Sequence, residues 1–437
     1  MEEGVVGLDS IMNKLYLYKK SLFDLWQRKS IRQIVGLLSV NTIGIPLAIF
    51  TNILVTRYLG PELFGDYKFI CSIFNLSALL VTLGFFQAGN RAIVLAKENQ
   101  RIREFYGAIL IVLFLLYVLM SLGLLIFAHF DSNLSDKGLT SLFIPVIPLG
   151  LIPLWNQLYE TILPASNKIG YLSKIRLFPK LINLVAACFL YYCAQRLPWN
   201  RLIAILLVYN LSQMITFIYV AFKLKPTLKD LKNRLKEIFT YNAQFGFNVY
   251  IGALFAVGLG YLTEILISYF GVNNVDVGYY SLSITLTQPL TFIPATIATT
   301  HYKSFASAPR IPPKIILTTL SLSGLSVIAL WLLIPPFIRY FYGNEFLPVI
   351  GINFFVCIAV FLHGYGDFIN RFIQAKGKGV MLRNASIVVG LATLLSNVLL
   401  IPSYGAYGAA FSKIINGLVY VAIIYYFYRK TIKDETI

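Results

Sequence analysis

The chain has 437 residues, of which 57% are hydrophobic and only 13% are charged, and its mean hydropathy is +0.72. A soluble domain carries about 25% charged residues, so this composition excludes the soluble classes and indicates a polytopic membrane protein. The formal net charge of +18 does not indicate nucleic-acid binding, because the basic residues lie between apolar runs instead of forming one patch or arm. This distribution favours a membrane surface and an anionic lipid substrate.

The N-terminal residues predict a helix on the membrane surface. From Ile11 to Leu25 apolar residues recur at helical spacing, and the basic and acidic residues between them lie largely on other faces. The order of segments found in a cleavable signal peptide is missing. The four cysteines show no CxxC spacing and fall in or beside apolar runs, so we expect buried thiols and no metal or redox site.

Apolar runs of about 20 residues, the length that crosses about 30 Å of hydrocarbon, follow one another along the chain. They predict an all-α polytopic membrane protein with about twelve transmembrane helices. The first six runs are 34–56, 67–88, 106–128, 141–163, 175–193 and 202–222. The other six are 245–270, 277–300, 315–341, 347–373, 385–401 and 407–428.

A basic segment at 223–240 separates the two groups of six runs. It holds six lysines and arginines against two acidic residues, so it cannot enter hydrocarbon and would be kept in the cytoplasm. We therefore expect a cytoplasmic amphipathic helix in 1–33, six-helix bundles in 34–222 and 241–428, a cytoplasmic linker in 223–240 and a cytoplasmic tail in 429–437. Basic residues in alternate loops also place both termini in the cytoplasm.

The two halves resemble each other at an offset of about 210 residues, as in transporters built from repeats. YLGPELFGDYKFI (58–70) follows the first run, and YFGVNNVDVGYYSLSI (269–284) follows the seventh. Each has a glycine where the helix ends and a second glycine just before a tyrosine. An even number of spans in each half makes the repeats parallel, so the two bundles are predicted to be pseudo-symmetric about the membrane normal.

Polar residues share helical faces in equivalent spans of the two halves. In hydrocarbon a polar side chain costs several kcal/mol unless it faces protein or water, so a shared face indicates a cavity or hydrogen bonds between helices. We expect Asn41 and Asn52 in the first span, Asn75 in the second and Gln288 in the eighth to line a central cavity. A further polar face in the tenth span, with His363 and Asp367, fits bundle packing as well as a cavity.

Four basic residues in spans or at their ends are candidate ligands for phosphate or an acidic sugar. They are Arg57, Lys68, Arg91 and Lys413. Arginine presents a planar fork to phosphate and lysine a point charge, although arginines at span ends can instead reach lipid headgroups. Glu264 and Asp367 are candidate proton or cation sites, because low dielectric raises a carboxylate's affinity for protons; either could instead pair with Lys413.

The sequence lacks the motifs expected of an enzyme. No GxxxxGK[ST] phosphate loop occurs, and no loop holds acidic residues at metal or glycosyl-transfer spacing. We therefore predict a transporter and no enzyme, with no catalytic residue and no metal site. No cofactor is predicted either, apart from coupling to H⁺ or Na⁺.

Several stretches carry a family resemblance. They are RYLGPELFGDYKF (57–69), LVTLGFFQAGNR (80–91), QAKGKG (374–379) and LLIPSYGAYGAAFS (399–412). Along nearly its whole length the chain resembles the polysaccharide-biosynthesis flippases, the Wzx-type O-antigen translocases. These belong to the multidrug, oligosaccharidyl-lipid and polysaccharide (MOP) exporter superfamily.

The resemblance implies a function and a setting. Two bundles would form a V around a cationic cavity in the bacterial cytoplasmic membrane. By alternating access they would carry an undecaprenyl-diphosphate-linked oligosaccharide, the repeat unit of O-antigen or another surface polysaccharide, across that membrane. The implied partners are this lipid-linked glycan, membrane lipids, and polysaccharide polymerase and chain-length regulator proteins, with no nucleic acid.

Three other functions stay open at this point. A multidrug cation exporter of the same fold would need a mainly acidic cavity, whereas the bases within these spans at least match the acids. A non-transporting scaffold of an envelope-glycan assembly complex would need no cavity at all. A lipid II flippase usually has more than the twelve spans counted here.

Overall fold

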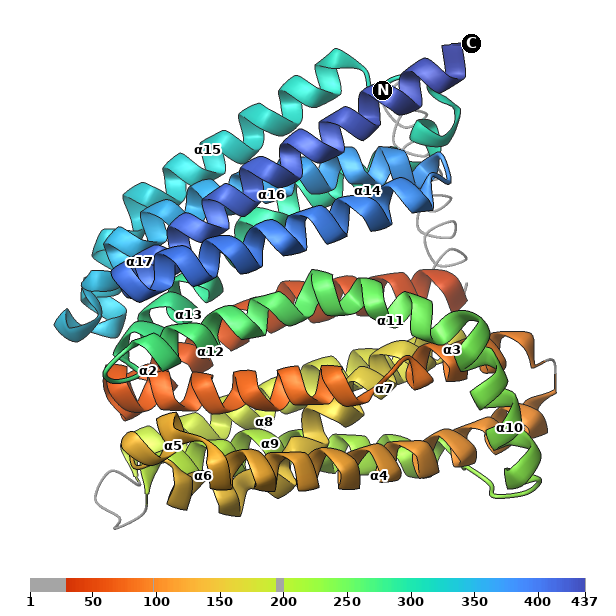
Figure 1. Cartoon of the computed structure of the whole chain (residues 1–437), viewed down its shortest axis with the longest axis horizontal. Coiled ribbons are helices and arrows are strands. Elements are labelled where there is room, and N and C mark those ends of the chain that lie inside the picture. The colour runs from red at the N-terminus through yellow and green to blue at the C-terminus, as the bar shows by residue number, and fades with distance from the viewer. Residues whose placement is uncertain (1–28, 97, 194–199, 437) are drawn as a thin grey trace, which may run out of the picture.

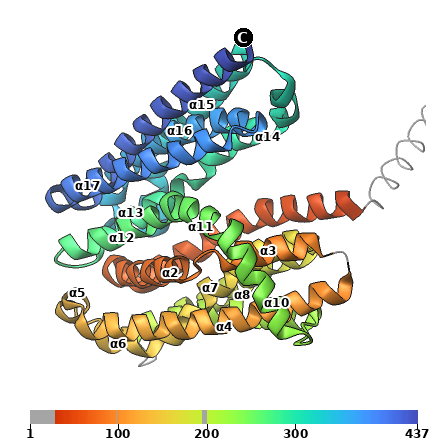
Figure 2. The ribbon, with the colours of Figure 1, turned by 45° about the vertical axis from the view of Figure 1, so that its right-hand side comes forward.

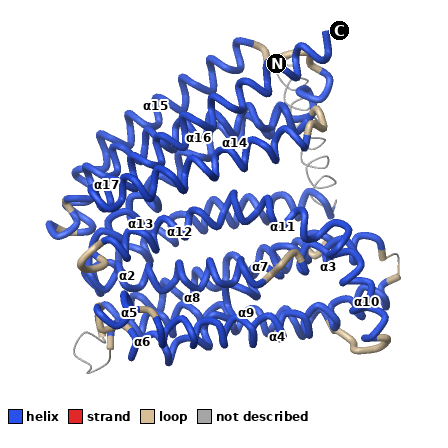
Figure 3. Tube along the Cα trace, viewed as in Figure 1, coloured by secondary structure: helices blue, strands red, loops and turns tan. Residues whose placement is uncertain are grey.

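The computed structural model describes residues 29–96, 98–193 and 200–436, and these residues form helices and loops with no strand (Figure 3). The surface helix predicted before the first span therefore lies almost wholly outside the described residues. The N-terminal half contains α2 (Lys29–Val81), α3 (Phe85–Leu95), α4 (Asn99–Phe130), α5 (Ser132–Asp136), α6 (Thr140–Val146), α7 (Leu151–Ala165), α8 (Ile169–Tyr192) and α9 (Arg201–Leu224). The C-terminal half contains α10 (Leu231–Tyr241), α11 (Phe247–Ala253), α12 (Leu259–Phe270), α13 (Val275–Thr287), α14 (Phe292–Ser307), α15 (Pro313–Phe337), α16 (Pro348–Ala375) and α17 (Gly379–Thr436).

The two longest helices are each a pair of helices joined at a glycine. α2 is broken at Gly60, where φ is 76°, and α17 is broken at Gly405, where φ is 53°. Only glycine adopts such left-handed values without steric cost, so each glycine sets the place of a reversal. α2 thus contains the first predicted span and most of the second, which ends in α3, and α17 contains the last two spans and residues 429–436 of the predicted tail.

Eight described helices are long and apolar enough to cross a membrane, and α2 and α17 are among them. The seventh predicted span falls short of that length because the π-helical turns η2 (Asn242–Gly246) and η3 (Leu254–Gly258) interrupt it. The eighth is interrupted by the 3₁₀ turn η4 (Gln288–Thr291), where Pro289 lacks a backbone donor. With the two double helices counted twice, the described helices supply the twelve predicted spans of an all-α fold.

The helices run lengthwise in two groups, α2–α9 and α13–α17, with α11 and α12 between them (Figures 1 and 2). We call one end of the molecule the linker end, because α10, the start of α2 and the end of α17 lie there. The opposite end, which holds the breaks at Gly60, Gly271 and Gly405, is the turn end.

Packing differs between the two ends. At the turn end one hydrophobic cluster includes Phe64 of α2, Leu282 of α13 and Val349 of α16, so the two halves share a core there. A second cluster, around Phe305 and Phe372, contains only residues of the C-terminal half and lies toward the linker end. Apart from α10 and the start of the seventh span, which pack on α3 and α4, the two halves are therefore joined at the turn end.

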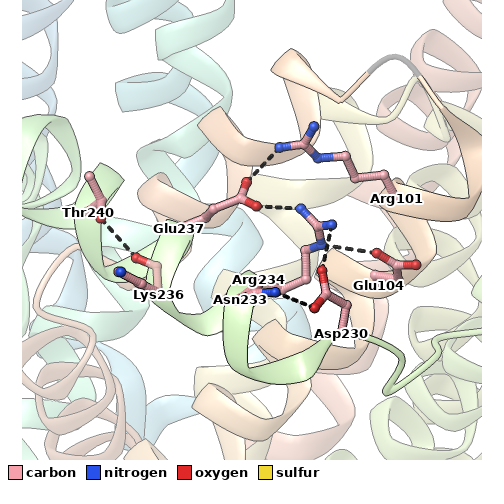
Figure 4. A network of polar contacts seen from close by, with 8 residues as sticks. All are labelled: Arg101, Glu104, Asp230, Asn233, Arg234, Lys236, Glu237 and Thr240. Carbon is pink, nitrogen blue, oxygen red and sulfur yellow. Dashed lines mark hydrogen bonds and ion pairs between the residues drawn. The ribbon is translucent and has the colours of Figure 1, made fainter.

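Ion pairs hold the linker helix α10 against the N-terminal half (Figure 4). Arg234 donates to Glu104 of α4 at 3.0 Å and to Asp230 at 2.9 Å, and it also pairs with Glu237. Glu237 in turn pairs with Arg101 at 2.8 Å. The side chains of Arg234 and Glu104 are only 14% and 7% exposed, so this pair is largely shielded from water.

Replacing Arg234 with methionine is expected to destabilise the fold by about 3 kcal/mol, because Glu104 would keep a buried charge without its partner. The midpoint of thermal unfolding in detergent measures this loss. Arg101→Met removes an ion pair whose arginine is 45% exposed, so it should cost less than about 1 kcal/mol. Equal shifts of the unfolding midpoint for the two variants would contradict a larger contribution from the buried ion pair of Arg234 and Glu104.

Candidate functional site

A polar cavity of about 440 Å³ lies inside the C-terminal half, among α12, α13, α16 and α17. His363, Asp367 and Asn370 reach it from α16, since residues three and four apart share one helical face. The other polar lining residues come from the remaining helices: Thr263, Tyr280, Ser386, Thr393, Asn397, Ser412, Lys413, Asn416 and Tyr420. The polar face predicted in the tenth span therefore faces a cavity.

Asp367 is the carboxylate of this cavity. Its side chain is exposed to the cavity space, and the Tyr420 hydroxyl donates to its Oδ1 at 2.8 Å. Asn370 donates to the same hydroxyl at 2.8 Å, which orients it toward the acid. Asp367 thus keeps an oxygen that an incoming ion or sugar hydroxyl can reach.

Lys413 brings a cation into the same space. It makes no hydrogen bond or ion pair with the described residues, although it interacts electrostatically with Glu264 and His363. Nε2 of His363 and Oδ1 of Asn416 are also buried without a partner in the described part of the chain. Buried polar atoms rarely lack a hydrogen-bond partner. Unpaired polar atoms around a polar cavity can bind a ligand or water.

Glu264 connects the cavity helix α12 to the other half of the molecule. Ser281 of α13 donates to its Oε1 at 2.6 Å, and Ser72 of α2 donates to its Oε2. Both serines are buried, whereas Glu264 is half-buried. A change of charge on Glu264 would therefore act on the contact between the halves as well as on Lys413.

The four predicted cations do not come together. Only Lys413 lines the cavity. Arg57 is exposed at the turn end and donates to a backbone carbonyl of the C-terminal half at 2.6 Å. Lys68 lies over the ring of Phe64, with 5.4 Å between Nζ and the ring centroid, and Arg91 is exposed on α3 toward the linker end. Arg57 and Arg91 are thus separated by the length of the second span.

The predicted polar residues also occupy separate places. Asn52 accepts a hydrogen bond from Tyr342 of the C-terminal half at 3.0 Å. Asn75 lines a smaller cavity of about 100 Å³ inside the N-terminal half, and Gln288 is exposed where η4 begins. Asn41 belongs to α2, but its side chain lies outside the part of the chain that the structure describes.

The structure adds a buried hydrogen-bond chain that we did not predict. Asn397 donates to Thr263 at 2.8 Å and accepts from Ser412 at 2.6 Å, which ties α12 to both legs of α17 beside the cavity. A sequence signal was available, because polar residues recur every fourth position at 393 and 397 and again at 412, 416 and 420.

No metal site accompanies this arrangement. Within residues 29–96, 98–193 and 200–436 no three His, Cys, Asp or Glu residues cluster as metal ligands would. The cysteines in that part of the chain are free thiols, but the prediction that they are buried holds only for Cys357: Cys71 and Cys188 are half-buried, and Cys193 is exposed at the end of α8. The cavity offers instead an ammonium, a carboxylate and several amides and hydroxyls, which suit an anion, a small cation or a sugar.

Solved structures of low identity share this fold. One is similar at a TM-score of 0.71 and 16% identity, over 91% of this chain and 87% of its own: the lipid II flippase MurJ in an inward closed conformation. A multidrug resistance MATE transporter of the MOP superfamily is similar in its inward-facing conformation at 0.67 and 18% identity, over 92% and 98%. In an outward-facing conformation the score is 0.59 at 15% identity, over 92% and 96%. The predicted MOP fold is confirmed.

Sequence comparison assigns the family. No curated protein sequence matches the chain significantly. A family model described as polysaccharide biosynthesis protein matches residues 30–308, which is more than half of the chain. The chain is therefore a multi-pass membrane protein of the polysaccharide biosynthesis family, as its sequence resemblance predicts, and it has the fold of the MOP transporters.

Proposed function

We propose that this protein is a flippase that moves a polyprenyl-diphosphate-linked oligosaccharide, the repeat unit of O-antigen or another surface polysaccharide, across the bacterial cytoplasmic membrane by alternating access. The observation that carries the proposal is the unpaired ammonium of Lys413 in a polar cavity inside a membrane-spanning bundle. Such a charge is expensive in a membrane unless it serves a ligand. A phosphate or an acidic sugar supplies the missing anion.

The cavity suits part of such a cargo. Its volume of about 440 Å³ lies within the range of small-molecule sites, roughly 300–1,000 Å³. Amides and hydroxyls from α16 and α17 can bind sugar hydroxyls, while the polyprenyl chain stays in the bilayer. Arg57 and Arg91 lie at opposite ends of the second span and would contact the diphosphate at the two membrane surfaces. Lys68 would contact it between these two positions.

Coupling to an H⁺ or Na⁺ gradient is part of the proposal, with Asp367 and Glu264 as its sites. Asp367 presents an oxygen to the cavity, and Glu264 bonds to Ser72 of the opposite half. A proton or cation bound at Glu264 would therefore change both the charge next to Lys413 and a bond across the two halves.

The orientation follows from charge. The linker end, with basic α10, would face the cytoplasm together with both termini, and the turn end would face outward. A polymerase and a chain-length regulator would then receive the flipped repeat unit at the turn end.

The direct test uses purified protein in liposomes that contain a fluorescent polyprenyl-diphosphate oligosaccharide. A membrane-impermeant reagent measures how fast the glycan becomes reachable from the other side, and the protein should accelerate this more than about tenfold over protein-free liposomes. Movement of a lipophilic cation such as ethidium in place of the glycan would identify a multidrug exporter. If the protein moves neither the glycan nor the cation, the scaffold function is the one that remains.

Asp367→Asn is expected to abolish the stimulation of flipping by an imposed H⁺ or Na⁺ gradient while flipping without a gradient continues, because the amide keeps the contact with Tyr420 but loses the charge. Initial rates with and without each gradient measure the effect. Full stimulation in this variant would remove Asp367 from the coupling mechanism.

A further inference from the structure

We propose that Lys137 is a latch residue: it holds the two halves together at the turn end and must release its partners before cargo can leave there. This inference rests on the alternating access of the proposed function, in which the turn end faces outward. Lys137 lies between α5 and α6, outside the apolar spans, and belongs to the N-terminal half. No property of the spans singles it out, yet its hydrogen-bond partners lie across the interface.

All the donors of Lys137 are used in the C-terminal half. Nζ donates to Oγ of Ser268 at 2.9 Å and to Oδ1 of Asn274 at 3.0 Å, and it also bonds to the backbone carbonyl of Ser268. An ammonium has three donors and no acceptor, so the side chain is fully satisfied. All three bonds cross the interface between the halves, which indicates a specific contact.

The acceptors are themselves bonded back to the N-terminal half. Asn274 donates to Asp66 of α2 at 2.7 Å, and Asn133 of α5 donates to Ser268 at 3.0 Å. The Ser268 hydroxyl in turn donates to Asn274 at 2.6 Å. Ser268, Asn274 and Asp66 are 0%, 1% and 8% exposed, so these bonds form away from water. Residues of α2 and of the α5 region in the N-terminal half thus hold the segment from Ser268 to Asn274 of the C-terminal half.

A network of this kind favours two discrete states. When it is complete, every buried group is paired, but partial separation leaves buried donors and acceptors without partners, which costs more than full closure or full hydration. The halves should therefore stay closed at the turn end or open it completely. Lys137 contributes three of the bonds that must break, more than any other side chain in the cluster.

The glycines of the repeat motif lie beside the latch. The second glycines of the two motifs, Gly65 and Gly278, meet across the interface: a Cβ on Gly278 would lie 3.2 Å from the backbone nitrogen of Gly65. Here backbone packs on backbone with no side chain between, which brings Asn274 close enough to bond with Asp66. The sequence repeat thus builds the closed interface that Lys137 fastens.

Spin-label distances test the latch in purified full-length protein without cargo, so the result does not depend on what the protein carries. In a background without native cysteines, one label pair at Ser135 and Val272 reports the turn end. A second pair at Asn99 and Ala306 reports the linker end. All four positions are exposed, and each pair spans the two halves.

Lys137→Met is expected to raise the population with a long turn-end distance more than about tenfold, since bonds to a charged donor are each worth about 1.5–3 kcal/mol. The linker-end distance should shorten in the same molecules. Arg339→Met removes an exposed positive charge from the turn end and should leave both distances unchanged. Asn133→Ala, which removes one bond, should give a smaller shift in the same direction.

The latch is overturned if Lys137→Met and Asn133→Ala both keep the wild-type turn-end distance. It is also overturned if the two label pairs broaden together, which indicates loosened packing instead of an opened gate. A protein that flips no glycan but shows the opposed distance changes would keep the latch and lose the proposed cargo.

Discussion

Lys413→Met is expected to reduce glycan export more than about tenfold, because the change keeps the bulk of the side chain and removes the only ammonium among the residues that line the described cavity. Surface glycan per cell, corrected for protein abundance, measures the effect in vivo, and the liposome assay measures it directly. Lys430→Met makes the same substitution on the same helix at an exposed position and should leave export unchanged. Normal export in Lys413→Met would refute a cargo contact.

A double variant separates the two roles open to Lys413. If its ammonium only balances the charge of Glu264, then Lys413→Met combined with Glu264→Gln removes both charges and should restore flipping measured without an imposed gradient, where coupling through Glu264 is not needed. If the ammonium binds the anionic part of the cargo, the double variant stays as inactive as Lys413→Met. The proposed function requires the second result.

The helical framework was accessible from sequence because the bilayer sets both the length and the composition of a span. Apolar runs of about 20 residues and the motif repeated at Gly60 and Gly271 were enough to predict twelve spans in two related halves. The π-helical turns before α12 were not predictable in this way. The first turn packs on α3, where Gly246 meets Gly84, and the second packs on α2 and α17, and no local pattern in 242–258 reveals these neighbours.

The site was less accessible for a geometric reason. Helical spacing shows which residues of one helix share a face, so it grouped His363 with Asp367 correctly. It does not show how neighbouring helices rotate about their axes, and that rotation decides whether Lys68 and Lys413 meet. The structure places only Lys413 at the cavity. Lys137 could not be predicted as a functional residue, because a lysine in a short loop has no distinctive sequence pattern and its importance follows from its partners across the interface.

Gly65→Ala is expected to stop the halves from closing at the turn end and to reduce flipping more than about a hundredfold. A Cβ at this position would lie 1.7 Å from the carbonyl oxygen and 2.5 Å from the carbonyl carbon of Asn274. Both are backbone atoms, so no side-chain rotation relieves the overlap, and a penalty of about 3 kcal/mol corresponds to that loss of the closed state.

The effect of Gly65→Ala should appear in two measurements. The turn-end label pair should report the open distance even though Lys137 is intact, and the flipping rate should fall. Gly123→Ala is the matched control, since Gly123 lies within α4 and nothing stands within 4 Å of the added methyl group. Because an alternating-access carrier must pass through both closed forms, a Gly65→Ala protein that flips glycan at the wild-type rate would show that closure at this interface is no part of the transport cycle.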